Sequence, residues 1–327
     1  MSAAHGGRTS RRAFMRATLG ASALAMAARP ASSQTGSNAS DGAQLGSASA
    51  SFPGARRVMW GAALMAHPLE ARLEAVAGSG FTHMTVFPAD MKRWRRSGLT
   101  DAAIRRAIEA SGVSVATLDP YTGWSPGWSL EGLDKFTREF IDVSEDDVWR
   151  MTDALGTDQV NCVESAGAAY SQEPYADALG AFAERARAKG LRTTFEFMPT
   201  SKVADIHAGW GLVEASGPLV GLTFDTWHFW RSDPDHGALR AIPIDRIAEV
   251  QVADGGATIV EDLQTDLLYH RRVPGEGAFD LRRTLAVLAE MGPVRSIGPE
   301  TFSAQMNELS AREAVRRNEK GLGNVLA

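Results

Sequence analysis

The chain of 327 residues is predicted to fold as a single (β/α)8 TIM barrel, an α/β fold in which eight parallel strands close into a ring. Eight short apolar runs alternate with segments whose apolar residues recur at helical spacing, and parallel strands need such long crossovers. The alternation occupies residues 53–327, the usual size of this barrel. The runner-up fold is a doubly wound open sheet. No expected strand is followed by G-x-G-x-x-G or G-x-x-x-x-G-K-[ST], so no phosphate-binding loop supports that alternative.

The eight expected strands are runs of six to eight residues, mostly apolar. Such runs are typical of strands that are buried on both faces. The expected strands cover residues 58–64, 81–87, 113–119, 159–164, 191–197, 220–225, 247–253 and 294–301.

Helices are expected between the strands. Thr100 is a suitable N-cap for one of them, and Gly112 follows its last turn. The apolar positions at helical spacing are Leu69, Leu73 and Val76; Ile104 and Ile108; Val148, Met151 and Leu155; and Leu281, Leu285 and Leu288. Residues 121–128 and 257–272 are expected to form long loops after strands, where barrel enzymes carry functional residues.

The first 31 residues are predicted to be a signal peptide of the twin-arginine type. The segment S-R-R-A-F-M-R at 10–16 precedes a short apolar run, 17–28, and then small residues, which is the order found in export signals. The paired arginines resemble the address read by the machinery that exports folded proteins. The alternative interpretation is an amphipathic tail. Residues 32–52, rich in Ser, Gly and Ala, are expected to be a flexible linker to a catalytic domain at 53–327.

Export by that route predicts a periplasmic or secreted protein with the export machinery as a partner. The apolar run is too short for a stable membrane anchor. The net charge of −5 argues against a nucleic-acid partner. The one cysteine, Cys162, excludes an internal disulfide and a thiolate zinc site and is expected in the core. A small-molecule substrate is the expected partner, and the sequence leaves homo-oligomerisation open.

Four side chains with oxygen donors lie near the ends of the last four expected strands. They are Glu196 in L-R-T-T-F-E-F, Asp225 in V-G-L-T-F-D, Gln251 in V-Q-V-A-D-G and Glu300 in V-R-S-I-G-P-E. Such positions converge on one mouth of a barrel, where three carboxylates would raise one another's pKa unless a cation is bound. Each acid alone is better explained as the N-cap of the next helix, but four in successive units favour a metal site. Oxygen donors suit Mn²⁺ or Mg²⁺, with Co²⁺ and Zn²⁺ as alternatives.

The motifs that surround these positions are F-E-F with Glu196, F-D-T-W-H with Asp225 and His228, Q-V-A-D with Gln251, R-R-V-P-G-E-G with Arg271 and P-E-T-F with Glu300. Together they resemble the xylose-isomerase-like sugar phosphate isomerase/epimerase superfamily, which includes the AP-endonuclease-type barrels. The resemblance covers residues 57–303. It implies that the metal ligands are Glu196, Asp225, Gln251 and Glu300. It also implies that His228 and Arg271 contact the substrate's oxygens.

The chain departs from this pattern in two places. Many members carry His where this chain has Gln251, whereas the members similar to dehydroshikimate dehydratase carry Gln. The second strand often ends with Glu in the family, and here it ends with Phe87. The three-zinc DNA-repair branch needs several further histidines, which an acidic chain with seven histidines does not match. His67 and His83 near strand ends and His270 in a loop are assigned no ligand role, because a lone histidine at such positions is more often packed or solvated.

The predicted function is that of a divalent-metal-dependent isomerase or epimerase acting on a sugar or a related polyhydroxy carbonyl compound. Glu196 and Glu300, on opposite sides of the metal, would remove and return a proton through a metal-stabilised enediolate. The alternative is a metal-dependent lyase or dehydratase that eliminates a β leaving group from a keto-sugar, an oxidised glycoside or a dehydroshikimate-like substrate. A non-catalytic periplasmic binding protein is less favoured, because a binder has no need for two bases.

Five tryptophans lie at expected strand ends or in the loops that follow them. They are Trp60, Trp124, Trp128, Trp227 and Trp230. The sequence favours two interpretations equally: packing of the loops over the barrel, or an aromatic wall for a sugar ring or an aromatic group.

Overall fold

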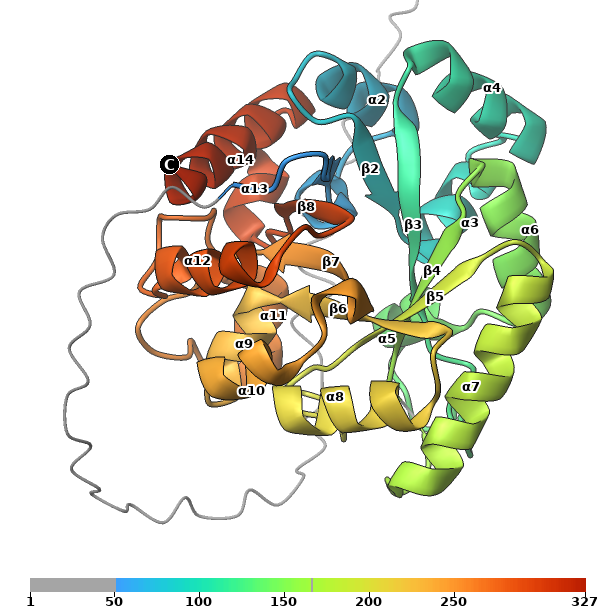
Figure 1. Ribbon diagram of the computed structural model, residues 1–327. Coiled ribbons are helices and arrows are strands. Elements are labelled where there is room, and N and C mark those ends of the chain that lie inside the picture. Colours follow the sequence, from blue (N-terminus) through green and yellow to red (C-terminus); the bar gives the residue numbers. More distant parts are fainter. Residues whose placement is uncertain (1–50, 166) are drawn as a thin grey trace, which may run out of the picture.

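The computed structural model describes residues 51–165 and 167–327. Within them eight parallel strands form a closed barrel in the order β1 to β8, with β8 paired to β1 (Figure 1). The strands are β1 (Arg56–Met59), β2 (His83–Val86), β3 (Ser114–Tyr121), β4 (Gln159–Val163), β5 (Arg192–Glu196), β6 (Val220–Asp225), β7 (Ile247–Val252) and β8 (Ser296–Pro299). The prediction of a (β/α)8 barrel is confirmed.

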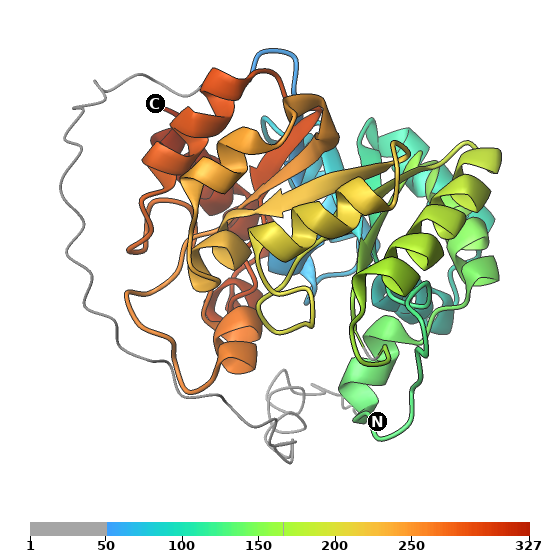
Figure 2. The ribbon, with the colours of Figure 1, turned by 60° about the horizontal axis from the view of Figure 1, so that its bottom comes forward.

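Helices surround the barrel and connect its strands (Figures 1 and 2). They are η1 (Gly61–Leu64), α2 (Leu69–Ala77), α3 (Pro88–Arg96), α4 (Asp101–Ser111), α5 (Lys135–Ile141), α6 (Glu145–Leu155), α7 (Gln172–Ala188), α8 (Ile206–Ala215), α9 (Thr226–Arg231), α10 (His236–Ala241), η2 (Ile244–Arg246), α11 (Leu263–Tyr269), α12 (Leu281–Met291), α13 (Ala304–Glu308) and α14 (Ala311–Leu326). The predicted caps of α4 are confirmed: Thr100 accepts from the backbone N–H of Ala103, and Gly112 adopts φ 73°.

The first strand is shorter than the sequence predicts. A strand is expected over 58–64, but β1 ends at Met59 and the residues from Gly61 to Leu64 form η1, a 3-10 helix. The backbone N–H of Gly61 donates to the Thr85 hydroxyl of β2 at 2.9 Å, so the chain leaves the strand ladder here. An apolar run shows that a segment is buried, and a buried 3-10 turn satisfies the same pattern.

The predicted signal peptide and all of the predicted linker except residues 51 and 52 lie outside the described residues, and both stay predictions. Among the described residues, no helix combines the length and the apolar character needed to cross a membrane.

The interior of the barrel is polar at its middle layer. Thr117 of β3 donates to Glu249 of β7 at 2.7 Å and accepts from the amide of Gln159 of β4 at 3.0 Å. Thr223 of β6 lies 3.4 Å from the other oxygen of Glu249. Because successive residues of a strand point to opposite faces, these side chains place the strand-end residues of β6 and β7 on the same inward face.

The outward faces of the strands form the apolar core with the helices. Phe195 of β5 contacts Trp124 edge to face, with ring centroids 5.7 Å apart. Phe182 of α7 stacks on Trp149 of α6 at 5.6 Å. Cys162 is fully buried in the same core, as expected. This packing holds the strands against their helices and so fixes the mouth into which the strand ends project.

Candidate active site at the barrel mouth

Asp225 ends β6 and also begins α9. Its Oδ1 accepts from the backbone N–H of Trp227 at 2.6 Å as the N-cap of α9, and its Oδ2 accepts from Arg271 at 2.6 Å. His228, in the first turn of α9, is therefore held beside the same carboxylate, with Nε2 3.5 Å from Oδ2. The helix-cap role and the site role, which the sequence presented as alternatives, belong to the two oxygens of one aspartate.

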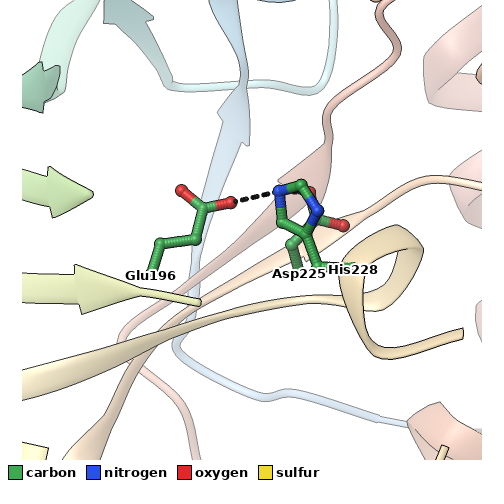
Figure 3. A group of neighbouring side chains, drawn as sticks. All are labelled: Glu196, Asp225 and His228. Atoms are coloured by element: carbon green, nitrogen blue, oxygen red, sulfur yellow. Dashed lines mark ion pairs between the residues drawn. The ribbon is translucent and has the colours of Figure 1, made fainter. Parts of the chain in front are cut away.

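Glu196 ends the neighbouring strand β5 and points toward His228 (Figure 3). Its Oε1 lies 3.1 Å from His228 Nε2, along the dashed line in Figure 3. One ligand atom from each of Glu196, Asp225 and His228 lies within 4.8 Å of the other two, and all three side chains are buried. The structure therefore brings together two of the predicted metal ligands and one of the predicted substrate contacts.

Gln251 of β7 lies between Glu196 and Trp60. With its amide oriented to satisfy both neighbours, Gln251 donates to Glu196 Oε1 at 2.8 Å and accepts from Trp60 Nε1 at 2.9 Å. The side chain is fully buried. Gln251 is thus in direct contact with the carboxylate cluster, as its place in β7 predicts.

Arg271 connects Glu300, the fourth strand-end residue, to Asp225 and His228. Its Nη1 donates to Asp225 at 2.6 Å and to Glu300 Oε2 at 3.1 Å, and its Nη2 lies 3.4 Å from His228 Nε2. The guanidinium is sandwiched between the rings of Trp227 and Phe302, at 4.9 and 5.0 Å from their centroids. All six residues singled out from the sequence therefore lie in one buried cluster.

Two further polar residues of this cluster were missed from the sequence. Asn161, inside β4, donates through Nδ2 to Glu196 Oε2 at 2.7 Å and to Asp119 Oδ1 at 2.9 Å. Its Oδ1 accepts from Thr194 and Thr223 at 2.9 and 3.0 Å. Asp119 lies at the end of an expected strand. The criterion that selected the other acids, a polar side chain at the end of an expected strand, therefore also applies to Asp119. Asn161 lies within a strand and carried no such signal.

Glu164 also lies at the end of an expected strand, but it has a different role. Glu164 follows β4 directly and is buried. Its carboxylate accepts from the backbone N–H of Lys202 at 2.8 Å and from Lys202 Nζ at 3.3 Å. It also accepts from the backbone N–H of Gly167 at 3.4 Å. Glu164 therefore ties the β4–α7 loop to the β5–α8 loop, and a strand-end acid is not by itself evidence for the cluster.

The carboxyl groups of the cluster are crowded and almost fully buried. They belong to Asp119, Glu196, Asp225 and Glu300. Burial, together with the charges of the neighbouring carboxylates, raises the pKa of Glu196 well above its ordinary value. Burial raises the pKa of Glu300 in the same way, against the opposing charge of Arg271. Burial also raises the pKa of Asp119 to about 6, although the hydrogen bond from Asn161 opposes the change.

Asp225 and His228 behave differently. Burial alone would raise the pKa of Asp225, but the positive charge and hydrogen bond of Arg271 outweigh it, and the pKa lies below its ordinary value. Burial lowers the pKa of His228 to about 3, so the imidazole is neutral near pH 7 and its Nε2–H can donate to Glu196. Among the described residues, Arg271 is then the only full positive charge that contacts these carboxylates.

A buried excess of negative charge with many oxygen donors fits a divalent cation. The oxygen donors are Glu196, Asp225, Glu300 and the amide of Gln251, and His228 adds one imidazole nitrogen. Carboxylates and an amide suit Mn²⁺ and Mg²⁺, and the imidazole is also compatible with Zn²⁺.

The tryptophans do not form one wall. Trp60 and Trp227 are fully buried, and Trp124 donates from its indole N–H to the Val163 carbonyl at 3.0 Å. Trp230 is partly buried and stacks on Phe279, with ring centroids 5.6 Å apart. For Trp60, Trp124 and Trp227, which are buried, the loop-packing interpretation is confirmed.

The closed barrel and the carboxylate cluster at the strand ends define the class of protein. The chain belongs to the xylose isomerase-like TIM barrel family, whose model matches residues 73–320. The curated relatives with significant similarity include a 3-dehydroshikimate dehydratase of Pseudomonas aeruginosa, 28% identical over 243 residues, which are 72% of this chain and 36% of that protein. They also include an inosose isomerase of Halalkalibacterium halodurans, 29% identical over 143 residues, which are 42% of this chain and 49% of that protein. The chain therefore spans about a third to a half of the length of these relatives.

Solved structures agree on the fold. An IolI protein described with a bound zinc atom superposes with a TM-score of 0.70 at 19% identity and covers 83% of this chain and 98% of its own. A fusion of a xylose isomerase-like TIM barrel with 4-hydroxyphenylpyruvate dioxygenase superposes with a TM-score of 0.68 at 22% identity, covering 82% of this chain and 41% of its own. The curated relatives named here are a dehydratase and an isomerase, and one further structural neighbour is an L-ribulose 3-epimerase.

Proposed function

We propose that the protein is a divalent-metal-dependent enzyme that removes a proton next to the carbonyl group of a polyhydroxy compound and so isomerises or epimerises it. The observation that carries the proposal is the pair Glu196 and Glu300, two buried glutamates of one cluster. Glu196, at the end of β5, lies 3.1 Å from His228, and Glu300, directly after β8, lies 3.1 Å from Arg271. Two carboxyl groups that come from different strands and face one buried cluster suit a pair in which one removes a proton and the other returns it.

The proposed metal ligands are Glu196, Asp225, Gln251 and Glu300, and the proposed metal is Mn²⁺ or Mg²⁺. For Gln251 this requires the amide oxygen, rather than the nitrogen, to face the cluster. A bound cation would draw electrons from the substrate's oxygen and so make the neighbouring C–H more acidic. It would also offset the excess charge of the four carboxyl groups, which Arg271 alone does not balance.

The remaining side chains would bind and orient the substrate. The neutral imidazole of His228 offers one donor and one acceptor in the cluster, and its Nδ1 has no partner within the described residues. The guanidinium of Arg271 is planar and held by two aromatic rings, which suits it to fix a hydroxyl or carbonyl oxygen in one position. Burial of these groups excludes water from the position where the proton moves.

A second candidate function is β-elimination by a lyase or dehydratase. Glu196 is held on both oxygens by Asn161 and His228, whereas Glu300 contacts Arg271. Two glutamates in different surroundings suit a reaction that uses one base, while an epimerase needs two bases that exchange roles. Two of the curated relatives are 3-dehydroshikimate dehydratases, and Gln251 stands where the resemblance associates Gln with such enzymes.

Proton exchange in D₂O tests the proposal. The Mn²⁺-loaded protein is incubated in D₂O with ketohexoses, inososes and keto-glycosides, and the products are followed by NMR. Glu196→Gln and Glu300→Gln should each slow exchange by about 10² to 10⁴-fold, and Glu249→Gln, which changes a buried glutamate away from the cluster, should not. Epimers or isomers with solvent deuterium support the first function, and loss of a leaving group supports the second. Full activity in either Gln variant of the pair, or no reaction with any substrate, would contradict the proposal.

A further inference from the structure

A cavity of about 500 Å³ lies at the end of the barrel opposite the carboxylate cluster. It is formed by the N-terminal ends of β5, β6 and β7, the end of α7, η2 and the residues before β8. Gly221, on β6, lies in its wall, where an added Cβ would stand only 3.1 Å from the Cβ of Ala248. The cavity lies at the floor of the barrel, and none of its lining residues belongs to the cluster at the mouth.

Four arginines line this floor cavity against one acid, Asp245. They are Arg187, Arg192, Arg246 and Arg295. Arg246 is committed to the fold, because it donates to the carbonyls of Val213, Gly217 and Val220. The other three arginines differ in how many of their side-chain hydrogen bonds are already made within the protein.

Arg295, directly before β8, donates through Nη2 to Asp158, directly before β4, at 2.7 Å. Its buried Nε has no hydrogen-bond partner within the described residues. Arg192 lies only loosely against the same carboxylate, at 3.9 Å. The side chain of Arg187 is exposed and makes no hydrogen bond or ion pair in the part of the chain that the structure describes. Even with Asp158 counted, positive charge exceeds negative charge around the cavity.

The hydroxyl of Thr193 adds an independent observation. Thr193 of β5 lines the cavity, is only 2% exposed, and its Oγ1 has no hydrogen-bond partner in the described chain. A buried hydroxyl without a partner costs free energy, and a valine of nearly the same shape would avoid that cost. This unsatisfied hydroxyl therefore lies in the wall of the cavity, beside the arginines.

We propose that the floor cavity binds a small organic anion with a phosphate or carboxylate group. Guanidinium groups recognise such groups through charge-assisted hydrogen bonds, and Arg187, Arg192 and Arg295 all line the cavity. The apolar walls, which include Leu219, Ile244 and Pro293, suit a ligand with an apolar body rather than an inorganic ion. The site is separate from the proposed active site and does not depend on the metal.

Calorimetric titration of the metal-loaded full chain tests the proposal, with phenyl phosphate, benzoate and inorganic phosphate as probes. Phenyl phosphate or benzoate should bind more tightly than inorganic phosphate, and which of the two binds identifies the head group. Arg187→Gln combined with Arg192→Gln should weaken binding at least tenfold, since a hydrogen bond to a charged group contributes more than an ordinary one.

Arg312→Gln is the matched control, because Arg312 is an exposed arginine paired with Glu74 far from the floor cavity. It should leave the affinity unchanged. Equal affinity in the Arg187/Arg192 double variant and the wild type would place the anion elsewhere, including at the mouth, and would overturn the proposal. No heat of binding with any of the three probes would overturn it as well.

Discussion

Asn161 Nδ2 donates to Glu196 Oε2 at 2.7 Å, so a side chain from inside one strand holds the carboxylate at the end of the next. The same nitrogen donates to Asp119, and the carbonyl oxygen of the amide accepts from two threonine hydroxyls. One neutral side chain thus connects the interior of the barrel to two acids of the site. Its position limits where the oxygens of Glu196 can lie.

Replacing Asn161 with Leu should therefore destabilise the protein and weaken metal binding together. The change removes the amide's hydrogen bonds to two buried carboxyls and two hydroxyls, and each group left unsatisfied costs about 1–3 kcal/mol. Thr194→Val removes one of these hydrogen bonds and is the control, with an expected loss of about 1 kcal/mol. Urea unfolding measures the free energy of unfolding of both variants. An Asn161→Leu variant as stable as Thr194→Val would show that the amide does not position the carboxylate.

Removal of the metal should lower the thermal stability. A cation that binds only the folded protein adds about 2.7 kcal/mol to its stability at a concentration 100 times the Kd. EDTA should therefore lower the Tm of the Mn²⁺-loaded protein, and excess Mn²⁺ should restore it. In Asp225→Asn the difference should disappear, while Glu249→Gln should keep it. An unchanged Tm in EDTA would speak against a bound metal at this cluster.

The stability should fall as the pH rises from about 4.5 to 7, partly because of Glu249. Burial raises the pKa of Glu249 from 4.5 to about 7, although hydrogen bonds from Thr117 and Thr223 oppose the change. Below pH 4.5 the group is protonated in both states and costs nothing. Between the two values the unfolded chain loses its proton first, so unfolding becomes more favourable, and above pH 7 the penalty is constant.

Glu249→Gln removes this titrating group. The free energy of unfolding of the variant is compared with that of the wild type in EDTA as a function of pH. The variant should gain stability relative to the wild type as the pH rises through this window, and the difference should level off above pH 7. A difference that does not change with pH would show that Glu249 has an ordinary pKa in the folded protein.

A buried ion pair beside the mouth should matter far more than a surface one. Arg72 of α2 donates to both oxygens of Asp90 of α3, at 2.6 and 2.7 Å, and both side chains are buried. Asp90→Asn leaves the arginine charge without its partner and should cost about 3–5 kcal/mol. Glu74→Gln breaks the exposed pair with Arg312 and should cause no measurable loss. Equal urea midpoints for the two variants would contradict this expectation.

The alternation of apolar runs and helical patterns was enough to predict the closed barrel, because parallel strands joined by helices have few ways to bury both faces. The strand-end rule also found Glu196, Asp225, Gln251 and Glu300. It works because β5 to β8 are adjacent and parallel, so residues one βα unit apart in the sequence end at the same edge. The first strand was predicted too long because apolar character alone does not distinguish a strand from a buried 3-10 turn.

The sequence by itself determined the barrel and the kinds of donors at its mouth, since both depend on local periodicity and on the order of the strands. Only the tertiary structure decided how these donors share their charges. Arg271 comes from a loop, and its packing between Trp227 and Phe302 directs it at Asp225, 46 positions earlier. Asn161 contacts Glu196 because its strand is the neighbour of β5 in the ring. Such contacts depend on side-chain packing across the barrel, which no pattern along one chain specifies.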